Sequence, residues 1–455
     1  MPDGVTGSNP AVADSTVAAT VAAIATSTVR SAGIGIVRVS GPNARDVASQ
    51  LFARLPEPRR AALRNFCDSD GNIIDRGLVL FFPMPASYTG EDMLELHAHG
   101  GIAVLQTLLA RVIEAGARPA RPGEFTERAF LNGQLDLAQA EAVADLIEAG
   151  SAQAARAAHA TLRGEFSTRL KILATALMAI RVKLEAGFDF SEEELGDKHL
   201  QNLMAELRDL ANKLQTLLAQ AIRGVRLRDG LRVVLVGAPN VGKSSVLNRL
   251  ANEERAIVTA IPGTTRDVIR EHIQLNGVSI ELMDTAGLHE SDDAVERIGM
   301  AHTVDRARSA DLVLLVSDDR DHAEVRTDLV DTDGEVLVLI NKIDLTGAEP
   351  GWRDGMIAVS AATGDGFAVL IRELERRAMC SEGGGEFSAR QRHVDCLQDA
   401  MSHVQRAIGV VESGLDVELC AEDLRQCQNA FGRITGTVTS DDLLGEIFST
   451  FCIGK

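Results

Sequence analysis

The feature that most constrains the fold is the octapeptide GAPNVGKS at residues 237–244. It follows the apolar run LRVVLV and precedes an apolar-periodic segment, which predicts a strand, a loop and a helix in that order. Such a loop offers its backbone N–H groups to phosphate at a helix N-terminus. We expect Lys243 to reach the β- and γ-phosphates and Ser244 to bind Mg²⁺ within an α/β domain.

Three further segments identify the nucleotide. DTAG follows the strand SIELM and places Asp284 to support Mg²⁺ and Gly287 to sense the γ-phosphate. NKID follows another apolar strand, and its Asp344 can accept hydrogen bonds from guanine N1 and N2. Adenine cannot make these bonds, so a site of this kind discriminates by about 10⁴- to 10⁵-fold. SAA at 360–362 completes the base pocket, and GTP is the predicted nucleotide.

The predicted GTP contacts come from these segments and from the loop TAIPGTT. They are Asn240, Val241, Gly242, Lys243, Ser244, Ser245, Thr259, Ala260, Ile261, Pro262, Gly263, Thr264, Thr265, Asp284, Thr285, Ala286, Gly287, Asn341, Lys342, Asp344, Ser360, Ala361 and Ala362.

The catalytic group for hydrolysis is less obvious from the sequence. Small GTPases commonly position the attacking water with a glutamine after DTAG, but here that position is Leu288, whose apolar side chain cannot orient water. The acidic stretch HESDDAVERIG supplies candidates, of which we favour Glu296; the other charges read as a solvated loop. In place of an arginine finger, Asn240 could hold a monovalent cation with carbonyls of residues 259–265.

Composition sets limits on the other functions. The 65 acidic and 46 basic residues give a net charge of −19, which argues against bulk electrostatic capture of nucleic acid, although a local basic patch or a basic partner stays open. Six scattered cysteines without a C-x-x-C pair predict reduced thiols and a cytoplasmic protein. We expect no membrane span, because no apolar run approaches the required length of about 18 to 20 residues. We expect residues 1–15 to be either a disordered extension or the result of a start codon placed too early.

The pattern of residue types along the sequence predicts four segments. Residues 16–130 alternate β-rich runs with Gly/Pro turns, which indicates an α+β domain, and 131–229 form long Ala/Leu helices. Residues 230–379 form a Ras-like P-loop GTPase domain, and 380–455 are helical again. The simplest interpretation is one helical domain that is split in sequence by an inserted α/β domain. The two halves of the helical domain would then pack together.

Several motifs together resemble the MnmE (TrmE) family of tRNA-modification GTPases, over residues 17–455. They are GAPNVGKSS, IPGTTRD, DTAGL and the terminal FCIGK, with GIGIVRVSG, YTGEDMLELHAHGG and RPGEFTERAFLNGQLDLAQAEAVADLI outside the GTPase segment. The resemblance implies a K⁺-dependent GTPase that dimerises through its N-terminal domain. With an FAD-containing MnmG-type partner, in a heterotetramer or larger complex, it would install a carboxymethylaminomethyl or aminomethyl group on C5 of the wobble uridine of certain tRNAs. A tetrahydrofolate derivative bound by the N-terminal domain would supply the carbon.

The resemblance also implies roles for individual residues. K⁺ would be held by Asn240, Thr259, Ile261 and Thr264, Mg²⁺ by Ser244 and Thr265, and folate by Arg38, Glu95, Gln134 and Lys455, with Glu296 as the catalytic glutamate. Two departures weaken the folate assignment. Position 134 is glutamine where lysine is often found, and STVRSAG stands in place of the usual P-P-G-R-G-G turn.

Cys452 in FCIGK has three interpretations. A prenylation box is disfavoured because Gly454 and Lys455 fit C-a-a-X poorly. A partly buried thiol in a final helix is the plain alternative, whereas the resemblance favours a thiol placed near the one-carbon group, as a nucleophile or as part of the pocket wall. A metal site at His97 and His99 is disfavoured because no third ligand is suitably spaced.

Two rival functions remain. A regulatory or ribosome-assembly GTPase switch would explain 230–379 but would leave the N-terminal domain and the tail without a role. A folate-binding protein with a vestigial GTPase is opposed by the intact GTP motifs. Folate binding together with K⁺-stimulated hydrolysis would favour the modification enzyme over both.

Overall fold

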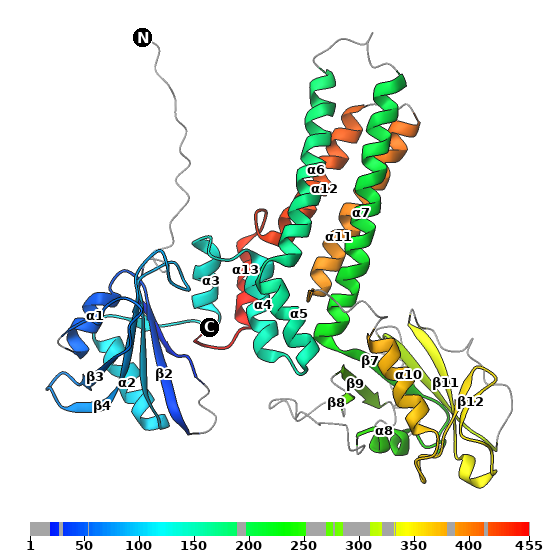
Figure 1. Ribbon diagram of the computed structural model, residues 1–455, viewed down its shortest axis with the longest axis horizontal. Helices are drawn as coiled ribbons and strands as arrows, with labels where there is room; N and C mark the ends of the chain where they lie inside the picture. Colours follow the sequence, from blue (N-terminus) through cyan, green and yellow to red (C-terminus); the bar gives the residue numbers. More distant parts are fainter. Residues whose placement is uncertain are drawn as a thin grey trace, which may run out of the picture. The chain divides into compact units, whose positions relative to one another are not determined.

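The structure is a computed structural model that describes residues 19–26, 31–52, 54–188, 197–251, 270–275, 278–284, 310–320, 332, 334–379, 387–413 and 417–454. The chain divides into two compact units (Figure 1). Unit 1 consists of Met1–Ala144 and Thr435–Lys455, and unit 2 of Asp145–Ile434.

Unit 1 is built on a sheet of six strands in the order β3-β4-β5-β2-β1-β6. Its strands are β1 (Val21–Ile24), β2 (Ala32–Ser40), β3 (Ala62–Cys67), β4 (Ile73–Phe82), β5 (Met93–Gly100) and β6 (Arg118–Pro119). Helices α1 (Ala44–Leu51) and α2 (Ile102–Glu114) share one core with the sheet, as expected for an α+β domain. Strand β5 shows why: Leu94, Leu96 and Ala98 enter this core, so the alternate residues Glu95 and His97 are left for the other face.

The chain's last helix packs within unit 1. Helix α13 (Asp441–Ser449) contacts α3 (Glu124–Leu131), and Phe448 and Phe451 pack on residues of α4 (Leu137–Glu148). The tail continues to a β-bridge between Pro122 and Ile453. The sequence pattern grouped this segment with the preceding helices. Within unit 1, Phe448 of α13 lies against Phe130 of α3, and Phe448 and Phe451 share a core with apolar residues of α4.

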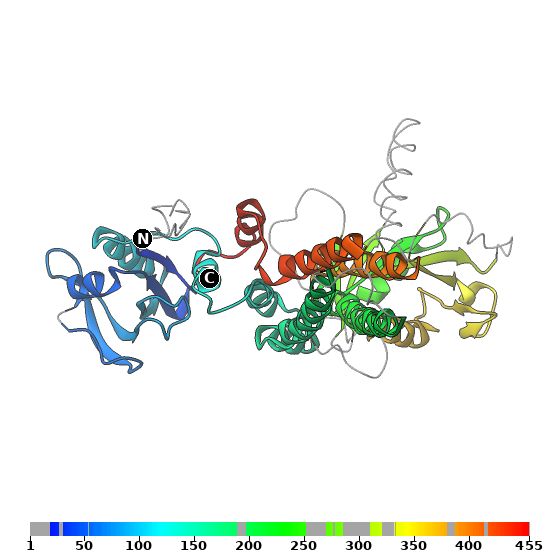
Figure 2. The ribbon, with the colours of Figure 1, turned by 90° about the horizontal axis from the view of Figure 1, so that it is seen from above.

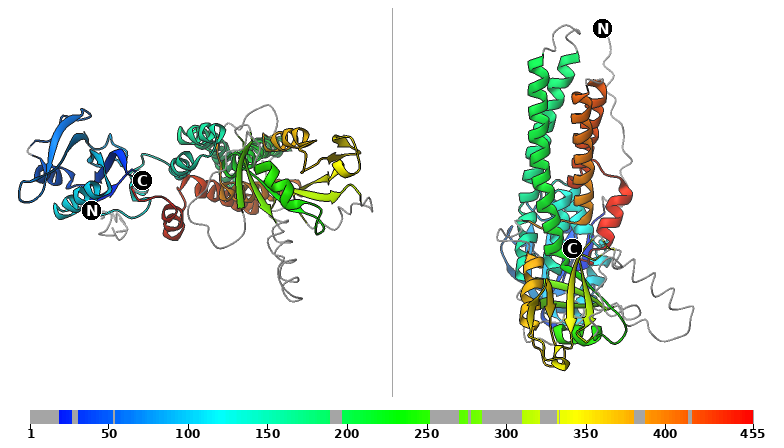
Figure 3. Two further views of the ribbon diagram at one scale, coloured as in Figure 1. Left: turned by 90° about the horizontal axis from the view of Figure 1, so that it is seen from below. Right: turned by 90° about the vertical axis from the view of Figure 1, so that its right-hand side faces the viewer.

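Unit 2 contains a group of long helices (Figures 2 and 3). They are α5 (Ala152–Leu162), α6 (Glu165–Phe188), α7 (Asp197–Asp229), α11 (Gln391–Glu412) and α12 (Val417–Thr435). Along α7, leucines recur at alternating spacings of four and three, and Leu203, Leu207, Leu210, Leu214 and Leu217 are all buried. This spacing forms a continuous apolar stripe, against which α11 packs although it follows α7 by more than 150 residues.

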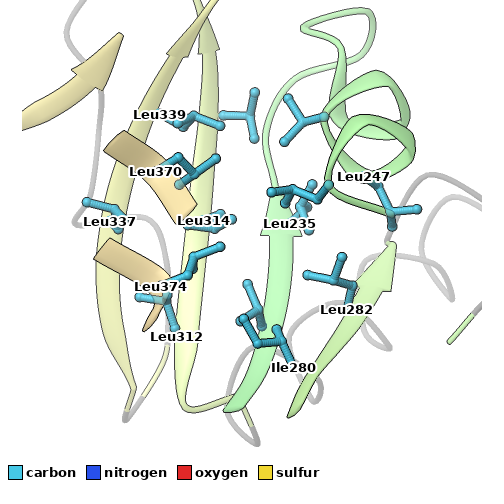
Figure 4. Packing of buried hydrophobic residues seen from close by; sticks show 14 of the residues in the cluster. Leu235, Leu247, Ile280, Leu282, Leu312, Leu314, Leu337, Leu339, Leu370 and Leu374 are labelled. Atoms are coloured by element: carbon cyan, nitrogen blue, oxygen red, sulfur yellow. The ribbon is translucent and has the colours of Figure 1, made fainter. Parts of the chain in front are cut away.

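Between α7 and α11 in sequence lies a seven-stranded sheet in the order β12-β13-β11-β10-β7-β9-β8. The strands are β7 (Leu231–Val236), β8 (Arg270–Leu275), β9 (Val278–Asp284), β10 (Leu312–Asp318), β11 (Glu335–Asn341), β12 (Gly351–Arg353) and β13 (Met356–Ala358). Strands β9, β7, β10, β11 and β13 are parallel neighbours. Helices α8 (Lys243–Ala251) and α10 (Phe367–Met379) pack on this sheet (Figure 4).

The parallel strands place the predicted nucleotide motifs along one edge. Their carboxyl ends lead into GAPNVGKS after β7, NKID after β11 and SAA after β13, and β9 ends at Asp284, which pairs with Leu235 of β7. Open parallel sheets bind ligands at this edge. The predicted strand, loop and helix at residues 231–251 are therefore confirmed.

Candidate functional site

The phosphate loop joins β7 to α8 through residues 237–242. Gly242 has φ +96°, and a Cβ atom there would lie 2.4 Å from Asn341 Nδ2, so only glycine fits. Asn240 has φ +63°, in the left-handed region that asparagine tolerates better than most residues. The loop is thus shaped by both positions before any ligand binds.

Lys243 is the first residue of α8, and its side chain lies back over the loop. Its Nζ donates to the carbonyls of Gly237 at 2.9 Å and Ala238 at 3.0 Å, and the residue is only 7% exposed. The two carbonyls compensate the buried ammonium in part. The group is therefore held at the loop, where a phosphate oxygen can replace a carbonyl as its acceptor. Ser244 and Ser245 follow in the first turn of the helix.

Asn341, at the end of β11, ties two loops together. Its Nδ2 donates to Val241 O at 2.9 Å, and its Oδ1 accepts from the backbone N–H of Ala361 at 3.0 Å. The side chain is almost fully buried, so both hydrogen bonds are shielded from water. One residue therefore fixes the distance between the phosphate loop and the predicted base-binding loop.

The base-binding loop orients the predicted guanine acceptor. Ser360 is buried, and its Oγ donates to Asp344 Oδ1 at 2.6 Å while accepting from Thr363 N at 3.1 Å. Asp344 itself is exposed at the mouth of the site. A carboxylate held by one oxygen presents the other in a fixed direction, which suits the N1–H and N2–H donors of guanine. Ala362 lies beside this pair in the same turn.

Lys342, the second residue of NKID, also reaches the phosphate loop. Its Nζ donates to Asn240 O at 2.5 Å and pairs with Asp318 Oδ2 at 2.8 Å. Asp318 is the last residue of β10 and was not singled out from the sequence, because it lies in no recognised motif. Hydrogen bonds from Arg320 and Lys342 hold the pKa of the Asp318 carboxyl well below its usual range, so it is ionised at neutral pH.

Several predicted site residues lie outside the described residues. These are Thr259, Ala260, Ile261, Pro262, Gly263, Thr264 and Thr265, then Thr285, Ala286, Gly287 and Glu296, and finally Lys455. Of Asp284 the structure describes the backbone only. Of the residues predicted to bind K⁺ and Mg²⁺, the structure therefore describes only Asn240 and Ser244.

A second site lies in unit 1, on the sheet face opposite α1 and α2. A pocket of about 620 Å³ is lined by residues that include Arg38, Tyr88, Glu95 and Gln134. The structure thus brings together three of the four residues predicted to contact folate. Tyr88 was missed as a site residue, although it lies in the motif YTGEDMLELHAHGG and is the chain's one tyrosine. Burial raises the pKa of Tyr88, whose hydroxyl is 2.8 Å from Thr126 Oγ1.

Arg38 is one of two arginines that line this pocket. Its Nε and Nη2 donate to Glu95 Oε1 at 3.1 and 2.8 Å, and its guanidinium lies 5.8 Å from the centre of the Tyr88 ring. The Arg38 Nη1 donates to Gly454 O at 3.4 Å, so the C-terminal tail reaches this arginine of the pocket. Gly454 has φ +96°, and a Cβ atom there would lie 2.5 Å from Ile24 O, which makes glycine necessary in the tail.

The tail also places Cys452. The Cys452 carbonyl accepts from Gly123 N at 3.4 Å, and the residue is exposed. The interpretation of Cys452 as a partly buried thiol in a final helix is therefore wrong, because Cys452 follows α13 and is exposed. Among the cysteines that the structure describes, Cys396, Cys420 and Cys427 are buried, and burial raises the pKa of all three thiols.

The two histidines of LHAHGG have carboxylate partners. His97 Nε2 lies 3.3 Å from Glu95 Oε2, and His99 Nδ1 lies 2.9 Å from Asp75 Oδ1. Within the described ranges, no group of three or more His, Cys, Asp or Glu is placed to hold a metal ion. In the same part of the chain, no helix is long and apolar enough to cross a membrane.

The chain is similar over most of its length to proteins of one family. The family models described as "MnmE helical domain" and "GTP-binding protein TrmE N-terminus" match residues 137–452 and 20–134. The "tRNA modification GTPase MnmE" of Nitrosomonas eutropha is 48% identical over 96% of this chain and 99% of its own length. That of Stutzerimonas stutzeri is 49% identical over the same shares. Likeness of this extent shows that the chain belongs to the MnmE (TrmE) family of tRNA modification GTPases.

Proposed function

We propose that this protein is a K⁺-dependent GTPase that works with an FAD-containing partner to modify C5 of the wobble uridine of certain tRNAs. A tetrahydrofolate derivative in the unit 1 pocket would supply the one-carbon unit, and a homodimer would be the working form. Family membership supports GTP hydrolysis and tRNA modification, since the relatives carry that name. The K⁺, folate and partner assignments rest on the resemblance and on the residues below.

The observation that carries the proposal is the union of two sites in one chain. Asn341 joins the phosphate and base loops of a GTP site, while Arg38 of the unit 1 pocket is hydrogen-bonded to the CIGK tail. A regulatory switch requires only the first. In the pocket, Arg38 would pair with a folate carboxylate, and the polar amide of Gln134 would supply a hydrogen bond where a lysine would supply charge.

Hydrolysis and modification lie in different parts of the chain, so we propose that motion couples them. The α/β segment would be an insertion that splits the helical domain, since α7 and α11 pack together on either side of it in sequence. Asp145 supports this: its Oδ1 accepts from Arg228 Nε at the end of α7 and from Arg390 Nη2 beside the start of α11, both at 2.8 Å. The end of α7 and the start of α11, between which the α/β segment lies in sequence, are thereby both bound to one carboxylate.

The test is reconstitution. The purified protein is incubated with its FAD-containing partner, unmodified tRNA, GTP and a tetrahydrofolate one-carbon donor, and the tRNA is digested for nucleoside mass spectrometry. The proposal predicts a modified wobble uridine only when GTP and the folate are both present. Full GTP hydrolysis with unmodified tRNA would instead favour the switch, and modification independent of folate would overturn the folate assignment.

A further inference from the structure

Asp318 ends strand β10 beside the phosphate loop and is engaged on two sides. Its Oδ2 lies 2.8 Å from Lys342 Nζ and 2.7 Å from Arg320 Nη2, and its Oδ1 accepts from Arg320 Nε at 3.0 Å. The Asp318 side chain is 12% exposed and Lys342 25%, whereas Arg320 is 55% exposed. Arg320 therefore forms the solvent side of the cluster and Lys342 its inner side.

Lys342 links Asp318 to the phosphate loop. The same ammonium that pairs with Asp318 donates to the Asn240 carbonyl at 2.5 Å. Lys342 and Asn240 both have left-handed backbones, at φ +68° and +63°, conformations that non-glycine residues hold only when surrounding contacts enforce them. The shared ammonium is such a contact, because it joins the two segments directly.

A lysine alone would hold this position poorly. Its side chain has four rotatable bonds and loses up to about 2 kcal/mol of rotamer entropy when fixed. Asp318 supplies a fixed negative charge from the end of a central strand, which anchors the ammonium whether or not a nucleotide is present. The backbone N–H of Arg320 in turn donates to Asp318 Oδ1 at 3.1 Å and orients the carboxylate.

We propose that Asp318 is a positioning residue for nucleotide binding: acting through Lys342, it holds the Asn240 carbonyl and so keeps the phosphate loop in its binding conformation before GTP arrives. The inference deepens the proposed GTP site and rests on it. Asp318 touches neither phosphate nor base in this role, and its effect passes entirely through one ammonium group.

The experiment measures the dissociation constant of mant-GDP for the full-length chain. Asp318→Asn keeps the shape of the side chain and removes its charge, and we expect about 10-fold weaker binding, the change that follows loss of one hydrogen bond between charged groups. Lys342→Met should weaken binding at least as much. The double variant should bind no more weakly than Lys342→Met alone, because the two residues act in series.

Asp311→Asn is the matched control. Asp311 directly precedes the other end of β10 and accepts from Arg232 N at 3.0 Å and Nε at 3.2 Å, so the same substitution there breaks an ion pair far from the loop. It should lower the melting temperature and leave mant-GDP affinity within about 2-fold. A purely structural role for Asp318 would give it the same behaviour as this control.

The experiment distinguishes failure of this inference from failure of the GTP site on which it rests. Unchanged affinity in Asp318→Asn, or single effects that multiply in the double variant, would overturn the inference while leaving the GTP site standing. Failure of the wild-type chain to bind mant-GDP would instead overturn the site itself. Recovery of affinity in Asp318→Glu, which restores the charge, would support the positioning role.

Discussion

Asn341→Ala is the substitution whose effect can be worked most directly from the structure. It removes two hydrogen bonds, from Asn341 Nδ2 to Val241 O and from Ala361 N to Asn341 Oδ1. A typical intramolecular hydrogen bond contributes a net stabilisation of about 0.5 to 1.5 kcal/mol, so the two together contribute about 1 to 3 kcal/mol. Without them the loops separate and hydrate, and nucleotide binding must order them first.

The free energy needed to order the loops weakens the binding of the nucleotide. At about 1.4 kcal/mol for each factor of ten, Asn341→Ala should weaken GDP and GTP binding by about 5- to 150-fold. The assay is mant-nucleotide fluorescence titration, with thermal unfolding measured in parallel. The matched control is Asn248→Ala, because Asn248 is exposed on α8 and the same atoms are removed there. An affinity within 2-fold of wild type, whatever happens to stability, would refute the proposed loop-tying role.

Three further predictions follow. Cys452→Ser should abolish tRNA modification while leaving GTP hydrolysis nearly unchanged; normal modification would remove the thiol from the mechanism. Asp145→Asn should reduce modification more than hydrolysis, since it loosens the carboxylate shared by Arg228 and Arg390, and an equal loss of both activities would argue against a relay. Burial alone would raise the pKa of Glu124, but hydrogen bonds, led by that from Arg118, lower it from 4.5 to about 2. Glu124 therefore stabilises the fold above pH 4.5, and the contribution is lost as pH falls toward 2. Glu124→Gln should cost about 3 kcal/mol in the free energy of unfolding at pH 7, and a deficit that persists near pH 2 in denaturant titrations would contradict this.

Much of the nucleotide site was predictable, because its motifs lie at the ends of strands that can be read from the sequence. Parallel strands bring their carboxyl ends to one edge, so Lys243, Asn341 and Ser360 had to converge once β7, β11 and β13 formed. The apolar strand predicted before NKID appears as Glu335–Asn341. The apolar runs and the motifs that follow them were therefore sufficient to predict this part of the site.

What could not be predicted depends on contacts between distant segments. The apolar face of α13 shows that it is buried but not which element covers it, so its packing on α3 and α4 could not be foreseen. Asp318 is one aspartate among many, and only the neighbouring strand shows its pairing with Lys342. Tyr88 and Asp145 have no spacing signal either, because their partners lie far away in the sequence.

The central claim is tested most directly by the rate of GTP hydrolysis in matched KCl and NaCl at equal ionic strength. If Asn240 helps to hold K⁺ where other GTPases use an arginine finger, the rate should be many-fold higher in KCl, and Asn240→Ala should remove the difference. Equal rates in the two salts would contradict the cation mechanism and would return the regulatory switch to consideration.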